Sequence, residues 1–205
     1  MPTQNDALSK ATHIQLNLVK YFSLAYVIIF ATIAVMKDNF EFLFYAILGL
    51  FAIWYVRNNY RELYFTKTIL TLISIFGFTH LLAGQLYING IKLYDTWFLG
   101  GLIKFDNIVH CFGGALAGFV AYNFLSNHLY KKMRRSTFAT FFLIITLASG
   151  FGAFNELIEF FAVIYFDAAE AVGDYTNTAV DIVYNFIGGL IAATVVVLYR
   201  RQNKD

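Results

Sequence analysis

The stretch AVDIVYNFIGGLIAATVVVL, residues 179–198, decides the fold. Its 20 residues hold one charged side chain, Asp181, and two arginines, Arg200 and Arg201, follow it. An α-helix needs roughly 20 predominantly apolar residues to cross the hydrocarbon core of a bilayer. The stretch therefore predicts a transmembrane helix near the C-terminus.

Similar apolar stretches precede it at residues 18–36, 40–56, 68–87, 108–125 and 138–160. The whole chain of 205 residues is 59% hydrophobic and 14% charged, about half the charged share of a soluble domain. The lone Cys111 excludes a disulfide framework, and a net charge of +2 gives no support for a nucleic-acid partner. We predict an all-α, polytopic membrane protein with six transmembrane helices, built as a single membrane domain over residues 1–205.

Basic residues are distributed unevenly between the predicted loops. Excess Lys and Arg stays on the cytoplasmic side of a membrane. If both termini, the second loop and the fourth loop face the cytoplasm, that side collects 12 of the 15 basic residues, including those at 131–135. The fifth loop carries Asp167, Glu170 and Asp174 and no Lys or Arg. We therefore expect an inner (plasma) membrane protein with cytoplasmic N- and C-termini, and an interfacial segment at residues 89–104 on the outer side.

Ionisable side chains inside the last four spans are exceptions in so apolar a chain. A charge at the bilayer centre costs at least ~2.5 kcal/mol even on insertion scales, so such residues indicate a functional site. With the predicted topology, all of them fall in the outer half of the membrane. They are His80 in the third span, Asp106 and His110 at the fourth, Glu156 and Glu159 in the fifth, and Asp181 and Asn185 in the sixth.

Small residues share the helix faces that carry these polar groups. Gly114 follows His110 by four residues, and Gly152 precedes Glu156 by four. Residues at this spacing lie on one face of a helix, and small residues let helices approach closely in lipid. We expect four helices that pack tightly toward the cytoplasm and open outward into a polar cavity.

Four motifs run through this region: FDNIVH at 105–110, NELIEF at 155–160, GD at 173–174 and DIVYNFIG at 181–188. In this order they resemble the YjdF-like family of bacterial inner-membrane proteins, and they are similar to the broader VanZ-like pattern. Asn107 and Glu159 depart from the VanZ-like pattern and favour the YjdF-like one. The resemblance implies signature positions at Asp106, His110, Glu156, Asp181 and Asn185, with Glu159 and Asp174 matching the YjdF-like version.

One interpretation of the cluster is a divalent-metal centre. Carboxylates and imidazoles on facing helices of a bundle hold such ions. The Glu-x-x-His spacing of di-iron bundles is absent, because residues 156 and 159 are both Glu. The metal ligands expected from residue type are His80, Asp106, His110, Glu156, Glu159 and Asp181.

A second interpretation is acid/base chemistry without a metal, with His110, Asp106 and Glu156 as catalytic residues. A carboxylate one helical turn from an imidazole orients it, and a glutamic acid in an apolar setting can donate a proton. A membrane lipid or a lipid-linked small molecule would reach such a site from the outer leaflet. The candidate substrate-binding residues are Asp174, Asn185 and Tyr87.

Two further interpretations stay open. Intramembrane acids and histidines can relay protons or cations in a transporter, although the chain has no inverted repeat of the common transporter kind. The polar residues can also be structural, with Asp106 capping the fourth helix and histidines bridging helices for ~0.6 kcal/mol each. The structural interpretation leaves several buried acids unmatched, because no Lys or Arg lies inside these spans. We therefore predict an outward-facing acid/histidine site that binds or modifies an amphiphilic envelope substrate, with or without a divalent metal.

Overall fold

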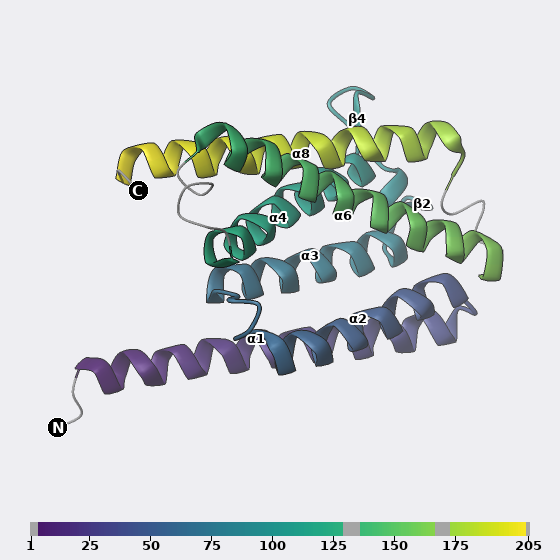
Figure 1. Cartoon of the computed structure of the whole chain (residues 1–205). Helices are drawn as coiled ribbons and strands as arrows, with labels where there is room; N and C mark the ends of the chain where they lie inside the picture. Colours follow the sequence, from purple (N-terminus) through teal and green to yellow (C-terminus); the bar gives the residue numbers. More distant parts are fainter. Residues whose placement is uncertain (1–3, 129–135, 167–172, 204–205) are drawn as a thin grey trace. The chain divides into compact units, whose positions relative to one another are not determined.

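The computed structural model describes residues 4–128, 136–166 and 173–203. Within these residues six α-helices are long and apolar enough to cross a membrane (Figure 1). They are α1 (Gln4–Met36), α2 (Phe40–Asn59), α3 (Lys67–Gln85), α4 (Phe105–His128), α6 (Thr137–Phe166) and α8 (Tyr175–Asn203). The predicted six-span, all-α membrane protein is confirmed. The basic residues at 131–135, and Asp167 and Glu170, lie outside the described residues, and the orientation of the termini stays a prediction.

The chain divides into two compact units, Met1–Leu82 and Ala83–Asp205. In the first unit α1 and α2 form an antiparallel hairpin, joined by the short connection at residues 37–39 (Figure 1). Asp38 in this connection adopts a left-handed backbone with φ of 51°. Asn39 begins α2, because its side-chain oxygen accepts a hydrogen bond from the backbone N–H of Phe42 at 3.0 Å.

Helix α3 packs on this hairpin through hydroxyls and aromatic rings. The hydroxyl oxygens of Ser23 in α1 and Ser74 in α3 lie 2.6 Å apart and are buried. The Phe78 ring of α3 contacts the rings of Phe22 and Tyr26, with centroids 5.5 and 5.7 Å apart. Because lipid offers no hydrophobic drive for helices to associate, such ring contacts and hydrogen bonds hold the first unit together.

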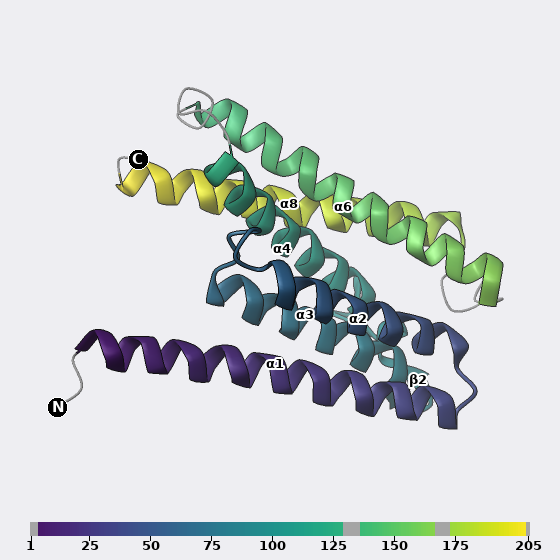
Figure 2. The same cartoon turned by 60° about the horizontal axis from the view of Figure 1, so that its bottom comes forward.

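In the second unit α4, α6 and α8 lie side by side (Figures 1 and 2). Glycines bring α4 and α8 together: a Cβ on Gly114 would collide with the carbonyl of Asn185, and one on Gly188 with the carbonyl of Cys111. Closer to the C-terminal ends of α4 and α8 lies a buried apolar core, made of Leu125, Ile144, Ala193 and Val196. The prediction that small residues let these helices approach closely agrees with this packing.

The segment between α3 and α4 folds as two short antiparallel hairpins and one turn of 3₁₀ helix. Strand β1 (Tyr87–Ile88) pairs with β2 (Ile91–Lys92), and β3 (Trp97–Phe98) pairs with β4 (Ile103–Lys104). The 3₁₀ helix η1 (Leu93–Asp95) joins them. The third helix therefore ends at Gln85, so the predicted span to residue 87 was two residues too long and Tyr87 lies in β1.

The other helices extend beyond the predicted apolar spans. Helix α4 starts at Phe105 instead of residue 108, α6 continues to Phe166, and α8 starts at Tyr175. A span predicted from hydropathy ends where polar residues begin. The helix itself continues through such residues, because its backbone hydrogen bonds extend to the capping residue. At α8 the cap is Asp174, whose Oδ1 accepts a hydrogen bond from the backbone N–H of Asn177 at 3.0 Å.

Candidate functional site

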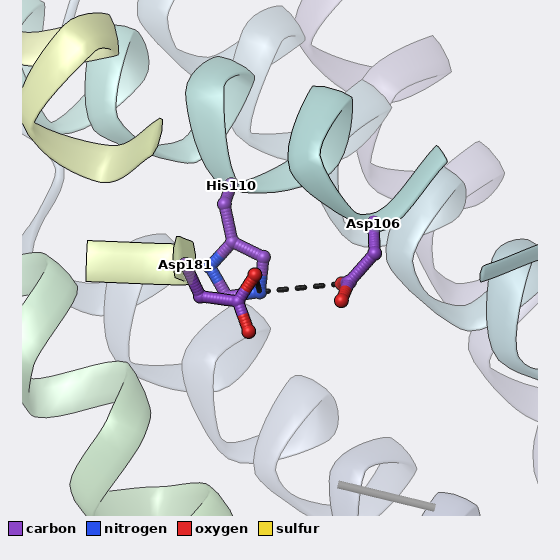
Figure 3. A group of neighbouring side chains, drawn as sticks. All are labelled: Asp106, His110 and Asp181. Atoms are coloured by element: carbon purple, nitrogen blue, oxygen red, sulfur yellow. Dashed lines mark ion pairs between the residues drawn. The ribbon is translucent and has the colours of Figure 1, made fainter. Parts of the chain in front are cut away.

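His110 is the centre of the polar cluster in the second unit. It lies in the second turn of α4, and its side chain is 8% exposed. Its Nε2 lies 3.3 Å from Oδ1 of Asp106, one turn earlier on the same helix (Figure 3). Asp106 is in the first turn of α4, where a carboxylate also interacts favourably with the helix dipole.

Helix α8 brings two more partners to the same imidazole. Oδ1 of Asp181 lies 3.7 Å from Nε2 of His110, and the side chain of Asp181 is 1% exposed (Figure 3). The amide nitrogen of Asn185, one turn along α8, lies 3.1 Å from Nδ1 of His110. Gly152 of α6 makes room for Asn185, since a Cβ at that glycine would lie 2.8 Å from Cβ of Asn185.

Helix α6 contributes the two glutamates of the NELIEF motif. Oε1 of Glu156 lies 3.7 Å from Nδ1 of His110, and its side chain is 9% exposed. Glu159, one turn later, accepts a hydrogen bond at Oε1 from the side-chain amide of Asn155 at 2.6 Å. The cluster thus joins three helices around one histidine.

Negative charge exceeds positive charge in this cluster. Four carboxylates from Asp106, Glu156, Glu159 and Asp181 surround one imidazole, and no Lys or Arg of the described residues forms an ion pair with them. Both side-chain oxygens of Glu156 and Oδ1 of Asp181 are buried and have no hydrogen-bond partner among the described residues. An unsatisfied buried acceptor costs about 1–3 kcal/mol, and more when charged. The arrangement therefore favours binding of protons or of a cation.

Two sets of three ligand atoms have the compactness of a metal site. Asp106, His110 and Asp181 form one set, and His110, Glu156 and Glu159 form the other; within each set the ligand atoms lie within 4.8 Å of one another. Donor atoms at this separation can all reach one ion at the usual 2.0–2.6 Å. Both sets share His110: Asp106 and Asp181 lie near its Nε2, and Glu156 lies near its Nδ1.

Five of the predicted residues that lie on α4, α6 and α8 meet at this centre, and Glu159 adjoins them. Asp174 instead caps the start of α8. Tyr87 lies half-exposed in β1. His80 belongs to the first unit, where its ring contacts those of Tyr45 and Phe42 at centroid distances of 5.1 and 6.1 Å. Roles for these three residues in the site stay predictions.

Asparagines that support the cluster were not assigned from the sequence. Asn155 donates to Glu159, and Asn177 donates to Oδ2 of Asp181 at 2.7 Å. Each asparagine precedes its acid by four residues, a spacing at which side chains meet on a helix. Asn107 is also buried, and its Oδ1 accepts a hydrogen bond from the backbone N–H of Lys104 at 3.0 Å. This bond satisfies a backbone donor just before α4.

These features define a class: a multi-pass membrane protein with a buried, carboxylate-rich histidine centre among three of its helices. Residues 18–202 match the model of the family described as predicted membrane protein (DUF2238), and the chain belongs to that family. It is the YjdF family, in agreement with the resemblance of the motifs, whereas likeness to VanZ-like proteins stays a prediction. Neither a search of curated proteins nor a search of solved structures found a match.

Proposed function

We propose that the His110 centre binds a divalent cation and, through it, the charged head group of an amphiphilic envelope molecule. The observation that carries this proposal is the pair of buried Glu156 oxygens, which lack a hydrogen-bond partner among the described residues and of which Oε1 lies 3.7 Å from Nδ1 of His110. Buried carboxylates persist when they are paired or coordinate a metal. A cation coordinated by Glu156 gives these oxygens a partner and offsets the excess negative charge.

The proposed ligands are Nδ1 of His110 and the carboxylates of Glu156 and Glu159. These three groups form one of the two compact sets. Imidazole together with carboxylates suits Mn²⁺, Fe²⁺ or Zn²⁺ better than the all-oxygen sites preferred by Ca²⁺. Two ligands from adjacent turns of α6 and one from α4 leave other coordination positions for a substrate oxygen or water.

The groups around the proposed ligands can hydrogen-bond to them and hold them in position, as residues next to metal ligands usually do. A metal-bound histidine usually donates its other ring N–H to a carboxylate. Asp106 lies 3.3 Å from Nε2 and can accept that hydrogen, with Asp181 at 3.7 Å as a second acceptor. Asn155 holds Glu159 in the same way, through its 2.6 Å hydrogen bond.

The substrate class follows from the setting of the centre. It lies near the start of α4, the start of α8 and the C-terminal half of α6, so all its groups are at one end of the second unit. The distribution of basic residues between the loops predicts that this end lies in the outer leaflet. The phosphate or carboxylate head group of a lipid or lipid-linked molecule could bind the cation, while its apolar tail stays in the bilayer.

Manganese binding tests the proposal directly. The purified full-length protein should bind Mn²⁺ and change its electron paramagnetic resonance spectrum, with loss of binding in Glu156→Gln. Asp174→Asn is the matched control, because it removes one carboxylate from α8 at the helix cap and outside both ligand sets. Equal Mn²⁺ binding by Glu156→Gln and wild type would overturn the proposal.

Acid/base chemistry at the Asp106–His110 pair is the second candidate. The observation in its favour is that Asp106 and Asn185 contact opposite ring nitrogens of His110, an arrangement that fixes the ring for proton transfer. This candidate predicts that His110→Ala changes the composition of envelope lipids in cells grown with a metal chelator. Unchanged lipid composition in that strain would contradict it.

A further inference from the structure

The first unit contains a cavity that the proposed function does not use. It measures about 460 Å³ and lies between α1, α2 and α3. This volume is within the ~300–1,000 Å³ typical of small-molecule sites. Apolar residues form most of its wall, among them Val19, Ile53, Val56 and Ile73.

Two cations lie on the wall of this cavity. Lys20 comes from α1 and Arg57 from α2, and no acidic residue lines the cavity among the described residues. Neither cation forms an ion pair within the part of the chain that the structure describes, and Nζ of Lys20 lies 4.9 Å from the centroid of the Tyr21 ring. The cavity therefore combines an apolar wall with unmatched positive charge.

The hairpin places the two cations at the same level. Lys20 precedes the connection at residues 37–39 by 17 positions, and Arg57 follows it by 18. With a rise of ~1.5 Å per residue, both lie ~25 Å from the connection, Lys20 at the middle of α1 and Arg57 in the last turn of α2. Long basic side chains at such a depth extend toward the head groups of the bilayer while their stems stay in the apolar region.

We propose that this cavity binds an anionic phospholipid, with one acyl chain among α1, α2 and α3 and the phosphate against Lys20 and Arg57. The charge favours an anionic head group, and the apolar wall favours an acyl chain over a water-soluble anion. Basic pockets between transmembrane helices are a recurrent form of lipid recognition. Small residues, Gly49 and Ala52, line the cavity on the α2 side and leave room for the chain.

Lipid binding to the full-length protein in detergent tests this proposal by native mass spectrometry. Phosphatidylglycerol should bind more tightly than phosphatidylcholine with the same acyl chains. Lys20→Ala and Arg57→Ala should each reduce that preference about fivefold. Lys67→Ala and Arg201→Ala, which remove the same charges outside the cavity lining, should leave it unchanged.

A filling substitution separates the acyl chain from the head group. Ala52→Phe should reduce binding of both lipids at least fivefold, because the ring occupies the cavity, whereas Val35→Phe on the exposed face of α1 should not. Equal binding of the two head groups, or an unchanged preference in the Lys20→Ala, Arg57→Ala double variant, overturns the proposal. Displacement of the lipid by glycerol phosphate alone, at equal concentration, also overturns it, since the acyl chain would then contribute nothing.

Discussion

The side-chain amide nitrogen of Asn185 lies 3.1 Å from Nδ1 of His110, and this contact links α8 to the centre of the polar cluster. Because an amide N–H only donates, Nδ1 accepts in this arrangement and the ring hydrogen is on Nε2, toward Asp106. The contact therefore selects the tautomer that leaves Nδ1 as a lone-pair donor. The proposed cation would use this lone pair in place of the hydrogen bond, so the Asn185 amide would have to turn away from Nδ1 when the cation binds.

Asn185→Leu tests the role of this contact. The leucine is close in size but cannot hydrogen-bond, so His110 loses a buried partner and the free energy of unfolding should fall by about 1–3 kcal/mol. Thermal unfolding in detergent measures the change. The control is Asn127→Leu at the exposed end of α4, with an expected effect within about 0.5 kcal/mol. Equal stability of the two variants would show that the contact contributes little.

Asp106→Asn tests whether Asp106 supports the proposed metal site by accepting the Nε2–H of His110. The amide keeps the shape of the side chain but loses the charge that holds the Nε2–H of His110 at 3.3 Å. Mutation of such partners lowers metal affinity by about 10–100-fold. Titration with Mn²⁺ should give this loss for Asp106→Asn and no loss for Asp95→Asn, whose carboxylate pairs with Lys104 in the hairpin segment. Complete loss of binding would instead make Asp106 a direct ligand.

The sequence predicts the existence of the six transmembrane helices better than it predicts the residues at which they begin. Apolar length alone identified the six helices, because the bilayer imposes the same requirement on each. The starts of α4 and α8 were missed by three and four residues, since Asn107 and Asp174 satisfy backbone groups through side chains that hydropathy does not measure. Local hydrogen bonds thus determine the residue at which each of these helices begins, which the hydrophobic pattern does not.

The cluster was predictable in part for a related reason. Asp106 and His110 share a helix face by spacing, but the meeting of His110 with Glu156 and Asp181 depends on how three helices pack. Glycines at 114 and 188 control that packing through contacts between backbones. Helical periodicity shows which residues share a face, and it does not show which faces meet.

Membrane orientation is open to a direct measurement. The distribution of basic residues predicts that both termini are cytoplasmic, since 12 of 15 then lie on that side. A green fluorescent protein fused after Asp205 should fluoresce, because it folds in the cytoplasm, while alkaline phosphatase at the same position should be inactive. Active phosphatase would reverse the topology and move the His110 centre to the inner leaflet.

Gly188→Ala tests whether close approach of α4 and α8 builds the centre. The added methyl would collide with the carbonyl of Cys111 and lie 2.6 Å from the backbone nitrogen of Ala115, so the helices must separate. Overpacking of this kind costs about 1–3 kcal/mol in a well-packed core. Gly150→Ala is the matched control, because a Cβ there has nothing within 4 Å and alanine favours a helix by ~1 kcal/mol. Thermal unfolding should therefore move in opposite directions for the two variants, and Mn²⁺ affinity should fall only in Gly188→Ala.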